Sequence, residues 1–133
     1  MTEPQPPQTF RPHERIKDPA DFRRAFDRKR SVSDAHLIVY GAENGLAHAR
    51  LGISVSRKKV RKATARNRIK RLIREAFRLV KADIPPGVDL VVLPRGPKLD
   101  FEAARASMAV LARDAARRLR APRREGPKPP PSP

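Results

Sequence analysis

Basic side chains are concentrated between residues 56 and 81, where the sequence reads SRKKVRKATARNRIKRLIREAFRLVK. Arginine presents a planar fork of donors that suits phosphate oxygens and guanine edges, and an amide both donates and accepts hydrogen bonds. Groups of this kind bind and position a polyanion and break no bond. The basic and amide residues are Arg57, Lys58, Lys59, Arg61, Lys62, Arg66, Asn67, Arg68, Lys70, Arg71, Arg74, Arg78 and Lys81.

The spacing within this segment predicts a helix with two different sides. At about 100° per residue, one side is mostly cationic and the apolar residues gather on the other. Glu75 is the only acidic residue of the segment, although like charges three or four residues apart on a helix repel one another. A charge run is often only a solvated surface, but this one-sidedness favours an external polyanion such as a phosphate backbone. The apolar side carries Ile69, Leu72, Ile73, Ala76, Phe77 and Val80.

The composition of the whole chain favours the same class of partner. The chain has 133 residues and a formal net charge of +17, which favours nucleic acid over a small-molecule substrate. An anionic membrane surface would also attract this charge, but no stretch approaches the roughly 18 apolar residues of a spanning helix. The first residues lack the apolar run of a secretory signal. We therefore expect a cytoplasmic protein.

Residue types that support catalysis are absent or scattered. The sequence contains no cysteine, which excludes disulfides, thiolate metal sites and a cysteine nucleophile. Its 14 acidic residues form no cluster suited to two-metal hydrolysis. His13, His36 and His48 have no ligand spacing. We expect the chain alone to hold no catalytic residue, metal or cofactor.

The elements that must position the basic helix begin on its N-terminal side. A first helix should run from residue 19 to about residue 28, with Asp18 as its N-cap and proline at the first helical position. Residues 36–40 and 49–56 have the pattern of strands. The turn between residues 41 and 45 predicts that these two strands form an antiparallel hairpin.

Two further elements follow the basic helix. Residues 88–93 form a compact apolar strand between proline-containing breaks. Asp100 should cap a last helix, which the apolar spacing extends to about Arg118. This order of elements implies an α/β sandwich with one sheet. The expected organisation is a flexible proline-rich extension at 1–14, a single RNA-binding α/β domain at 15–119, and a flexible basic proline-rich tail at 120–133.

Residues 66–75, RNRIKRLIRE, follow a strand that reads RLGISVS and a basic turn. The segments DFRRAF and LIVY before them, and DLVVLPR after them, complete the pattern. With these motifs the chain resembles the protein subunit of bacterial ribonuclease P over roughly residues 15–119. That family has an α/β (α+β) two-layer sandwich like the second domain of ribosomal protein S5. The resemblance implies a mixed sheet of about four strands, three helices and a left-handed βαβ crossover through the basic helix.

The resemblance also implies a function. Proteins of this family assist an RNA-based endoribonuclease that removes the 5′ leader from precursor tRNA, so the implied partners are the ribonuclease P RNA and precursor tRNA. The RNA subunit holds the catalytic Mg²⁺ that the holoenzyme requires. The implied contacts to the RNA subunit are Arg57, Lys58, Lys59, Arg61, Lys62, Arg66, Asn67, Arg68, Lys70, Arg71 and Arg74.

A cleft between the first helix and the sheet would bind the leader in such a protein. By motif position its lining is Phe22, Phe26, Tyr40 and Ser54. Stacking of unpaired bases on aromatic rings contributes about 1–3 kcal/mol per base. Without the resemblance, these aromatic residues would be assigned to the core.

Two other classes of protein share part of the pattern. A structural RNA-binding module, such as a ribosomal protein, would have the charge and the sandwich but no aromatic leader-binding cleft. A DNA-binding protein could lay the basic helix in a major groove. Leader-dependent binding, and competition between duplex DNA and structured RNA, would distinguish the three.

Overall fold

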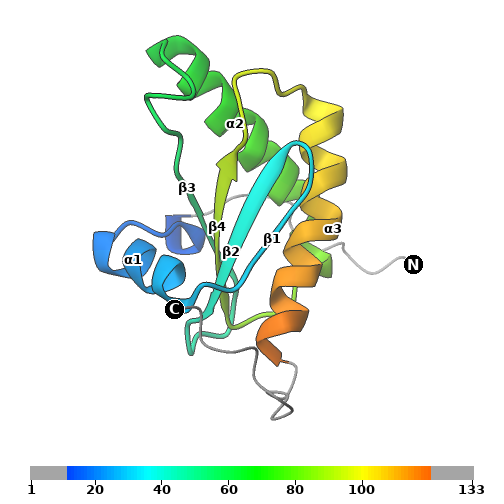
Figure 1. The fold of residues 1–133 in the computed structure, drawn as a ribbon. Helices are drawn as coiled ribbons and strands as arrows, with labels where there is room; N and C mark the ends of the chain where they lie inside the picture. The colour runs from blue at the N-terminus through cyan, green and yellow to red at the C-terminus, as the bar shows by residue number, and fades with distance from the viewer. Residues whose placement is uncertain (1–11, 121–133) are drawn as a thin grey trace, which may run out of the picture.

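The computed structural model of the protein describes residues 12–120. Three α-helices and one four-stranded mixed sheet confirm the expected α/β (α+β) class (Figure 1). In chain order the elements are η1 (Pro12–Glu14), α1 (Pro19–Arg28), β1 (Ser31–Ser33), β2 (Leu37–Glu43), β3 (Arg50–Ile53), α2 (Ala63–Val80), η2 (Lys81–Asp83), β4 (Val88–Pro94) and α3 (Phe101–Arg120).

β4 lies inside the sheet, whose strand order is β1-β2-β4-β3. It pairs antiparallel with β2 and parallel with β3, so the expected antiparallel hairpin between residues 36–40 and 49–56 is wrong. Every residue of β4 except Leu93 is buried. A continuous apolar run is typical of a strand covered on both faces, and this explains why β4 separates β2 from β3.

The strands differ from the expected ones in three respects. β2 continues through Gly41 to Glu43, because these residues still pair with β4. β3 ends at Ile53, earlier than residue 56. β1 was not predicted, since Ser31–Ser33 contains a single apolar residue and gives no strand pattern. It is defined only by its pairing with β2.

The helices are divided between the two faces of the sheet. α2 and α3 share the larger core with one set of alternating strand residues, including Leu51 and Leu90. α1 packs on the opposite face, where Ala25, Ala42 and Val91 belong to a second buried cluster. The molecule is thus a sandwich of a sheet against α2 and α3, with α1 covering part of the other face.

The connection from β3 to β4 passes through α2 and joins two parallel neighbours. In Figure 1, both strands run upward, and α2 passes behind the sheet as the chain moves from β3 to β4 on its right. This is the left-handed sense that the resemblance implies, against the right-handed default. The crossover leaves one long side of α2 exposed beside the edge strand β3.

Both predicted N-caps are present. The Asp18 carboxylate accepts a hydrogen bond from the Ala20 N–H at 2.9 Å, and that of Asp100 accepts one from the Ala103 N–H at 2.8 Å. Carboxylates at these positions satisfy N–H groups that have no partner within the helix. α1 ends where Lys29 adopts a left-handed conformation, with φ of 54°.

The described residues include a short element just before the expected boundary at residue 15. Pro12–Glu14 forms a short 3₁₀ helix, and the buried Glu14 carboxylate accepts hydrogen bonds from Lys81 at 2.9 and 3.1 Å. The Ile16 N–H donates to the Leu51 carbonyl at 2.9 Å. Residues 1–11 and 121–133, which hold most of the expected extension and tail, lie outside the described residues. Within residues 12–120, no helix is long and apolar enough to cross a membrane.

Candidate RNA interface and aromatic cleft

The apolar side of α2 fixes the helix on the sheet. Five of its six predicted residues are buried, and Leu72 is half-buried at the edge of the contact. Full burial of such side chains contributes about 1.5–3 kcal/mol each. Because this side faces the core, the opposite side is left for solvent or a partner, and Asn67 and Arg71 on it are exposed.

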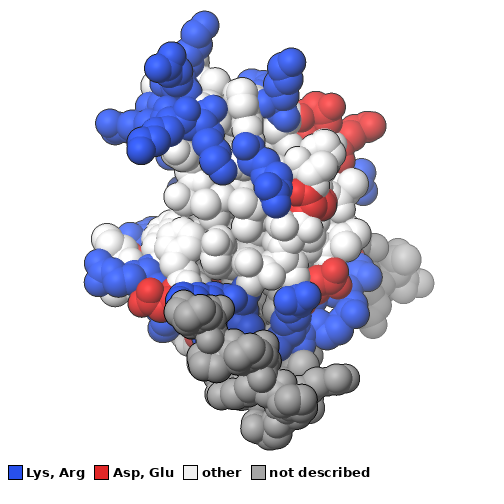
Figure 2. Space-filling model, viewed as in Figure 1, with Lys and Arg blue, Asp and Glu red and all other residues white. Residues whose placement is uncertain are grey.

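A basic loop of residues 57–62 precedes α2. The Ser56 carbonyl accepts from the Val60 N–H at 2.9 Å, and the Ser56 hydroxyl accepts from the Lys58 N–H at 3.1 Å. Val60 is 1% exposed and anchors the loop in the core. Figure 2 shows basic side chains projecting from this end of the molecule. The exposed residues are Arg57, Lys58, Lys59, Arg61 and Lys62.

The N-terminus of α2 adds to the positive potential of the basic loop. In the described part of the chain no side chain caps this end, and the first turn contains no acidic residue. Its first N–H groups and the positive end of the helix dipole therefore point toward the loop. Phosphate groups are favoured at such a helix end.

Arg66 and Arg68 are engaged by backbone carbonyls on different sides of α2. Arg66 Nη1 donates to the Val60 and Arg61 carbonyls at 3.0 and 2.8 Å, so Arg66 holds the basic loop closed. Arg68 Nη2 donates to the Leu99 carbonyl at 2.9 Å, next to the start of α3. Both arginines thus have a structural contact besides the implied contact to RNA.

Ion pairs neutralise part of the cationic side near the C-terminal end of α2. Arg78 pairs with Glu75 at 3.0 Å, and Lys81 pairs with Glu14 at 2.9 Å. The inference that this whole side awaits an external polyanion therefore does not hold at Arg78 and Lys81. The cations on this side of α2 that form no ion pair within residues 12–120 include Lys70, Arg71 and Arg74, and the neutral amide of Asn67 lies beside them.

Arg74 lies close to other cations on this surface. Partial burial lowers the pKa of its guanidinium, and the nearby charges of Arg15 and Arg71 lower it further. Within residues 12–120, neither Lys70 nor Arg74 takes part in an ion pair. A group whose charged form is disfavoured by neighbouring cations is stabilised when an anion arrives.

Phe22, Phe26 and Tyr40 form an aromatic cluster between α1 and the sheet. All three are partly exposed and pack on the smaller buried cluster. The rings of Phe26 and Tyr40 meet edge to face, with centroids 5.0 Å apart and an interplanar angle of 75°. Ser54 is half-buried just after β3, where its N–H donates to the Val92 carbonyl at 3.0 Å. The aromatic cluster is thus exposed enough to meet a ligand.

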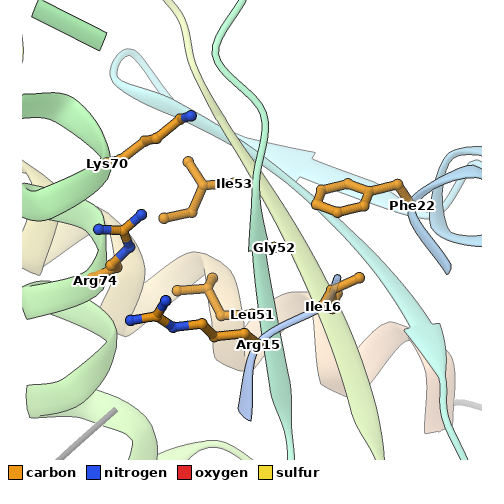
Figure 3. Close-up of a pocket in the computed structure, with 8 residues that line it drawn as sticks. All are labelled: Arg15, Ile16, Phe22, Leu51, Gly52, Ile53, Lys70 and Arg74. Carbon is orange, nitrogen blue, oxygen red and sulfur yellow. The ribbon is translucent and has the colours of Figure 1, made fainter. Parts of the chain in front are cut away.

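A pocket of about 130 Å³ is lined by residues of α2 and by Phe22, one member of the aromatic cluster. Figure 3 shows Lys70 and Arg74 projecting from α2 toward one side of β3, with Phe22 of α1 on the other side of Gly52. Sequence reasoning placed these basic residues with the RNA subunit and Phe22 with the leader. The structure brings members of both sets to one pocket. Its lining is Arg15, Ile16, Phe22, Leu51, Gly52, Ile53, Lys70 and Arg74.

A network around Asp89 lies at the other flank of α1 and was not predicted. Asp89 is 0% exposed and accepts hydrogen bonds from Arg50 at 2.7 and 2.8 Å, Arg24 at 2.9 Å and Asn44 at 2.9 Å. The hydrogen bond to Asp89 raises the pKa of Arg50, against the effect of burial. The only sequence signal was a single carboxylate inside the apolar strand VDLVVLP.

Metal ligands do not cluster in the described part of the chain. Among residues 12–120 there is no group of three or more histidine, cysteine, aspartate or glutamate side chains that could hold a metal ion. His13 and His48 do meet, with ring centroids 4.8 Å apart, and the His48 ring nitrogen contacts the His13 carbonyl at 2.9 Å. The expectation that the chain alone binds no cofactor stays a prediction.

Comparison with known families decides the class of this protein. The model of the family described as Ribonuclease P matches residues 10–116, which is most of the chain. The chain belongs to the ribonuclease P protein family. The match includes the basic loop, α2, the aromatic cluster and the Asp89 network.

Relatives and solved structures agree with this assignment. The ribonuclease P protein component of Methylococcus capsulatus is 46% identical over 90 residues, covering 68% of this chain and 70% of that protein. That of Pelotomaculum thermopropionicum is 38% identical, covering 72% and 85%. The RNase P protein of Staphylococcus aureus superposes with a TM-score of 0.67 at 36% identity, covering 77% of this chain and 94% of that one. The Thermotoga maritima RNase P protein gives 0.68 at 37% identity, covering 76% and 96%.

Membership of the ribonuclease P family leaves the role of each residue to be argued from this chain. Spacing identified α2 and its exposed cations. It did not identify Arg15, because a single arginine outside the helix gives no periodic signal. It also could not separate Arg66 and Arg68, with their backbone partners, from Arg71, which is exposed on the cationic side.

Proposed function

We propose that this chain is the protein subunit of ribonuclease P, an endoribonuclease that matures the 5′ end of tRNA. In this proposal it binds the catalytic RNA subunit and the 5′ leader of precursor tRNA, and it assists hydrolysis of the phosphodiester bond between leader and tRNA. The observation that best supports this proposal is the pocket lined by cations of α2 and by an aromatic ring of α1. Phosphates and unstacked bases of a single strand are recognised by this combination.

The basic loop and the N-terminal half of α2 are proposed as the contact to the RNA subunit. The exposed charges there are not offset by acidic neighbours within the first turn of the helix. RNA phosphates release counterions when these cations bind, and each contact steepens the salt dependence of affinity by about 0.7–0.9 log units. The charge also reduces repulsion between two RNA molecules, the RNA subunit and the substrate.

The aromatic cluster is proposed as the contact to the leader. Phe22, Phe26 and Tyr40 offer ring faces and edges at the surface, and Lys70 and Arg74 lie across β3 from Phe22. A leader strand that crosses this region could stack a base and place a phosphate near a cation. A ribosomal protein would not require such exposed aromatic residues, so their exposure favours the leader-binding function.

Catalysis is assigned to the RNA subunit in this proposal. The Mg²⁺ that such a holoenzyme requires would be held by RNA, because residues 12–120 offer no clustered set of metal ligands. The protein subunit holds the substrate and screens charge. The cytoplasm is the proposed compartment. The chain contains no cysteine, which agrees with a compartment where disulfides are rare.

A reconstitution experiment tests the proposal. The purified chain is mixed with a precursor tRNA, with and without a bacterial ribonuclease P RNA, at a low magnesium concentration. The chain should stimulate correct cleavage only when the RNA subunit is present. Cleavage by the chain alone, or no stimulation of the RNA, would contradict the proposed function.

Variants of the aromatic cluster test whether this cluster binds the leader. Phe22→Ala and Tyr40→Ala should weaken binding of precursor tRNA to the holoenzyme and leave binding of mature tRNA unchanged. Loss of one stacked base corresponds to about 1–3 kcal/mol, or about 5- to 150-fold in affinity. Equal weakening of both tRNAs would show that the cluster is not a leader site.

A further inference from the structure

α1 has two chemically different flanks on either side of its contact with the sheet. Ala25 is 0% exposed and marks the line along which the helix touches β2 and β4. At about 100° per residue, the aromatic residues fall on one side of Ala25 and the charged residues on the other. The aromatic flank carries Phe22 and Phe26, and the charged flank carries Asp21, Arg24 and Arg28.

The charged flank is fixed to the sheet by directional contacts. Arg24 Nη2 donates to Asp89 Oδ2 at 2.9 Å, and Asp21 lies 3.3 Å from Arg50 Nη2. Arg28 reaches Glu43 on β2 with contacts of 2.7 and 3.1 Å. The aromatic flank, by contrast, packs through ring and apolar contacts, and apolar contacts are not directional. The rotation of α1 about its own axis is therefore set on the charged flank.

Asp89 lies at the centre of these contacts, and its buried carboxylate requires hydrogen-bond donors. Its side chain is 0% exposed and accepts from Arg50, Arg24 and Asn44. A buried carboxylate without partners is strongly destabilising. Arg50 and Asn44 belong to the sheet side of the network. Arg24 is the donor to Asp89 that comes from α1, and its side chain is 48% exposed.

We propose that Asp89 and Arg24 are positioning residues for the leader: their contact holds α1 at the rotation that directs Phe22 and Phe26 toward the substrate. This inference rests on the proposed function of the aromatic cluster. Neither residue is required to touch the leader. Asp89 acts through Arg24, and Arg24 acts through the backbone of α1.

The distinction from a purely stabilising network is measurable. If Asp89 and Arg24 only stabilised the fold, Arg24→Ala would lower the melting temperature and leave leader binding unchanged well below it. If they position α1, the same variant changes the aromatic cluster in a protein that is still folded. Arg24→Ala suits this test, because Asp89 keeps its contacts with Arg50 and Asn44.

The first readout is the fluorescence of Tyr40. The chain has one tyrosine and no tryptophan, so its emission reports directly on the ring that touches Phe26. Arg24→Ala in the full chain should increase quenching of Tyr40 by acrylamide while far-UV circular dichroism stays unchanged. Arg113→Ala is the matched control, because this exposed arginine on α3 lies across the sheet from α1. Unchanged quenching in Arg24→Ala would overturn the proposal.

The second readout is the affinity of the reconstituted holoenzyme for precursor tRNA divided by that for mature tRNA. Arg24→Ala should lower this ratio about tenfold, which corresponds to the loss of roughly one stacked base. Arg24→Lys should recover part of it, since an ammonium can still donate to Asp89. Asp89→Asn should resemble Arg24→Ala. The amide replaces one acceptor oxygen of Asp89 with an NH2 group, which carries two N–H donors and cannot accept hydrogen bonds from the neighbouring donors. Arg113→Ala should leave the ratio unchanged.

The outcomes separate this inference from the proposed function. A wild-type holoenzyme that binds both tRNAs equally would refute leader binding itself, and the positioning role with it. A wild-type preference for precursor tRNA that persists in Arg24→Ala and Asp89→Asn would overturn only the positioning role. Equal loss of affinity for both tRNAs, or for the RNA subunit, would likewise overturn the positioning role and leave leader binding intact.

Discussion

Gly52 lies directly under the ring of Phe22, and its substitution tests how the aromatic cluster is seated. A Cβ atom at this position would lie 2.8 Å from two carbons of the Phe22 ring and 3.2 Å from Ile16 Cβ. Carbon atoms make favourable contacts at about 3.5–4.0 Å. Gly52→Ala would therefore force the ring to retreat by about 0.7 Å or more.

The expected cost follows from this overlap. Overpacking a well-packed site costs about 1–3 kcal/mol, and the lower half of that range applies because Phe22 is partly exposed and has room to move. For a domain of about 100 residues, 1–2 kcal/mol corresponds to a fall in Tm of roughly 4–16 °C. The displaced ring should also weaken leader binding by the proposed holoenzyme.

Chemical and thermal unfolding followed by circular dichroism would measure this cost. Gly96→Ala is the matched control, because a Cβ there meets nothing within 4 Å. Gly96→Ala should be neutral or stabilise the protein by about 0.4–1 kcal/mol, because alanine lowers the conformational entropy of the unfolded chain. A double-mutant cycle with Phe22→Ala isolates the overlap, since the ring is then absent and Gly52→Ala should cost less.

Two results would refute this reasoning. If Gly52→Ala were as stable as the wild type, the ring of Phe22 would not be seated on β3 as described. If the cost were the same with and without the Phe22 ring, the glycine would be required by Ile16 or by the strand. The aromatic cluster would then not depend on it.

Two further predictions concern other parts of the fold. Burial would raise the pKa of Asp34, but hydrogen bonds from the Ser107 hydroxyl and two backbone N–H groups hold it below the ordinary 3.8. Its contribution to the free energy of unfolding is therefore present above about pH 3.8 and is lost as the pH falls through the folded pKa. The stability difference between wild type and Asp34→Asn, measured in urea titrations, should thus be constant above about pH 3.8 and shrink as the pH falls below it. Arg68→Ala, which removes the hydrogen bond to Leu99, should cost about 0.5–1.5 kcal/mol of stability, whereas Arg71→Ala should keep the wild-type Tm and weaken RNA-subunit binding in filter assays. Equal stability loss in both arginine variants, or a pH-independent effect of Asp34→Asn, would contradict these assignments.

The helices could be predicted because their signals are local. Asp18 and Asp100 satisfy N–H groups two or three residues away, and the apolar side of α2 repeats within the helix itself. The strand order could not be predicted in the same way. A hairpin is the default for two strands close in sequence. β4 lies between β2 and β3 because it is buried on both faces, and this burial depends on α1 as well as on α2 and α3.

Site residues show the same limit. The cations of α2 were found by their number and spacing, but whether a cation is paired depends on distant residues. Lys81 is neutralised by Glu14, which is 67 positions away, and Arg68 is held by Leu99, 31 positions away. Asp89 collects its partners from α1, β3 and the segment after β2. No periodicity within one element carries that information.

The pocket beside β3 changes how the two proposed binding sites relate to each other. Sequence reasoning separated an RNA-subunit side on α2 from a leader side on α1, yet Lys70, Arg74 and Phe22 line one pocket. Because β3 is an edge strand of the described sheet, no further strand separates α2 from α1 at this point. A leader leaving the aromatic cluster across Gly52 would meet Lys70 and Arg74 before it reached the basic loop. In the proposed complex, the left-handed crossover that leaves α2 beside β3 would let one helix contact both RNA molecules.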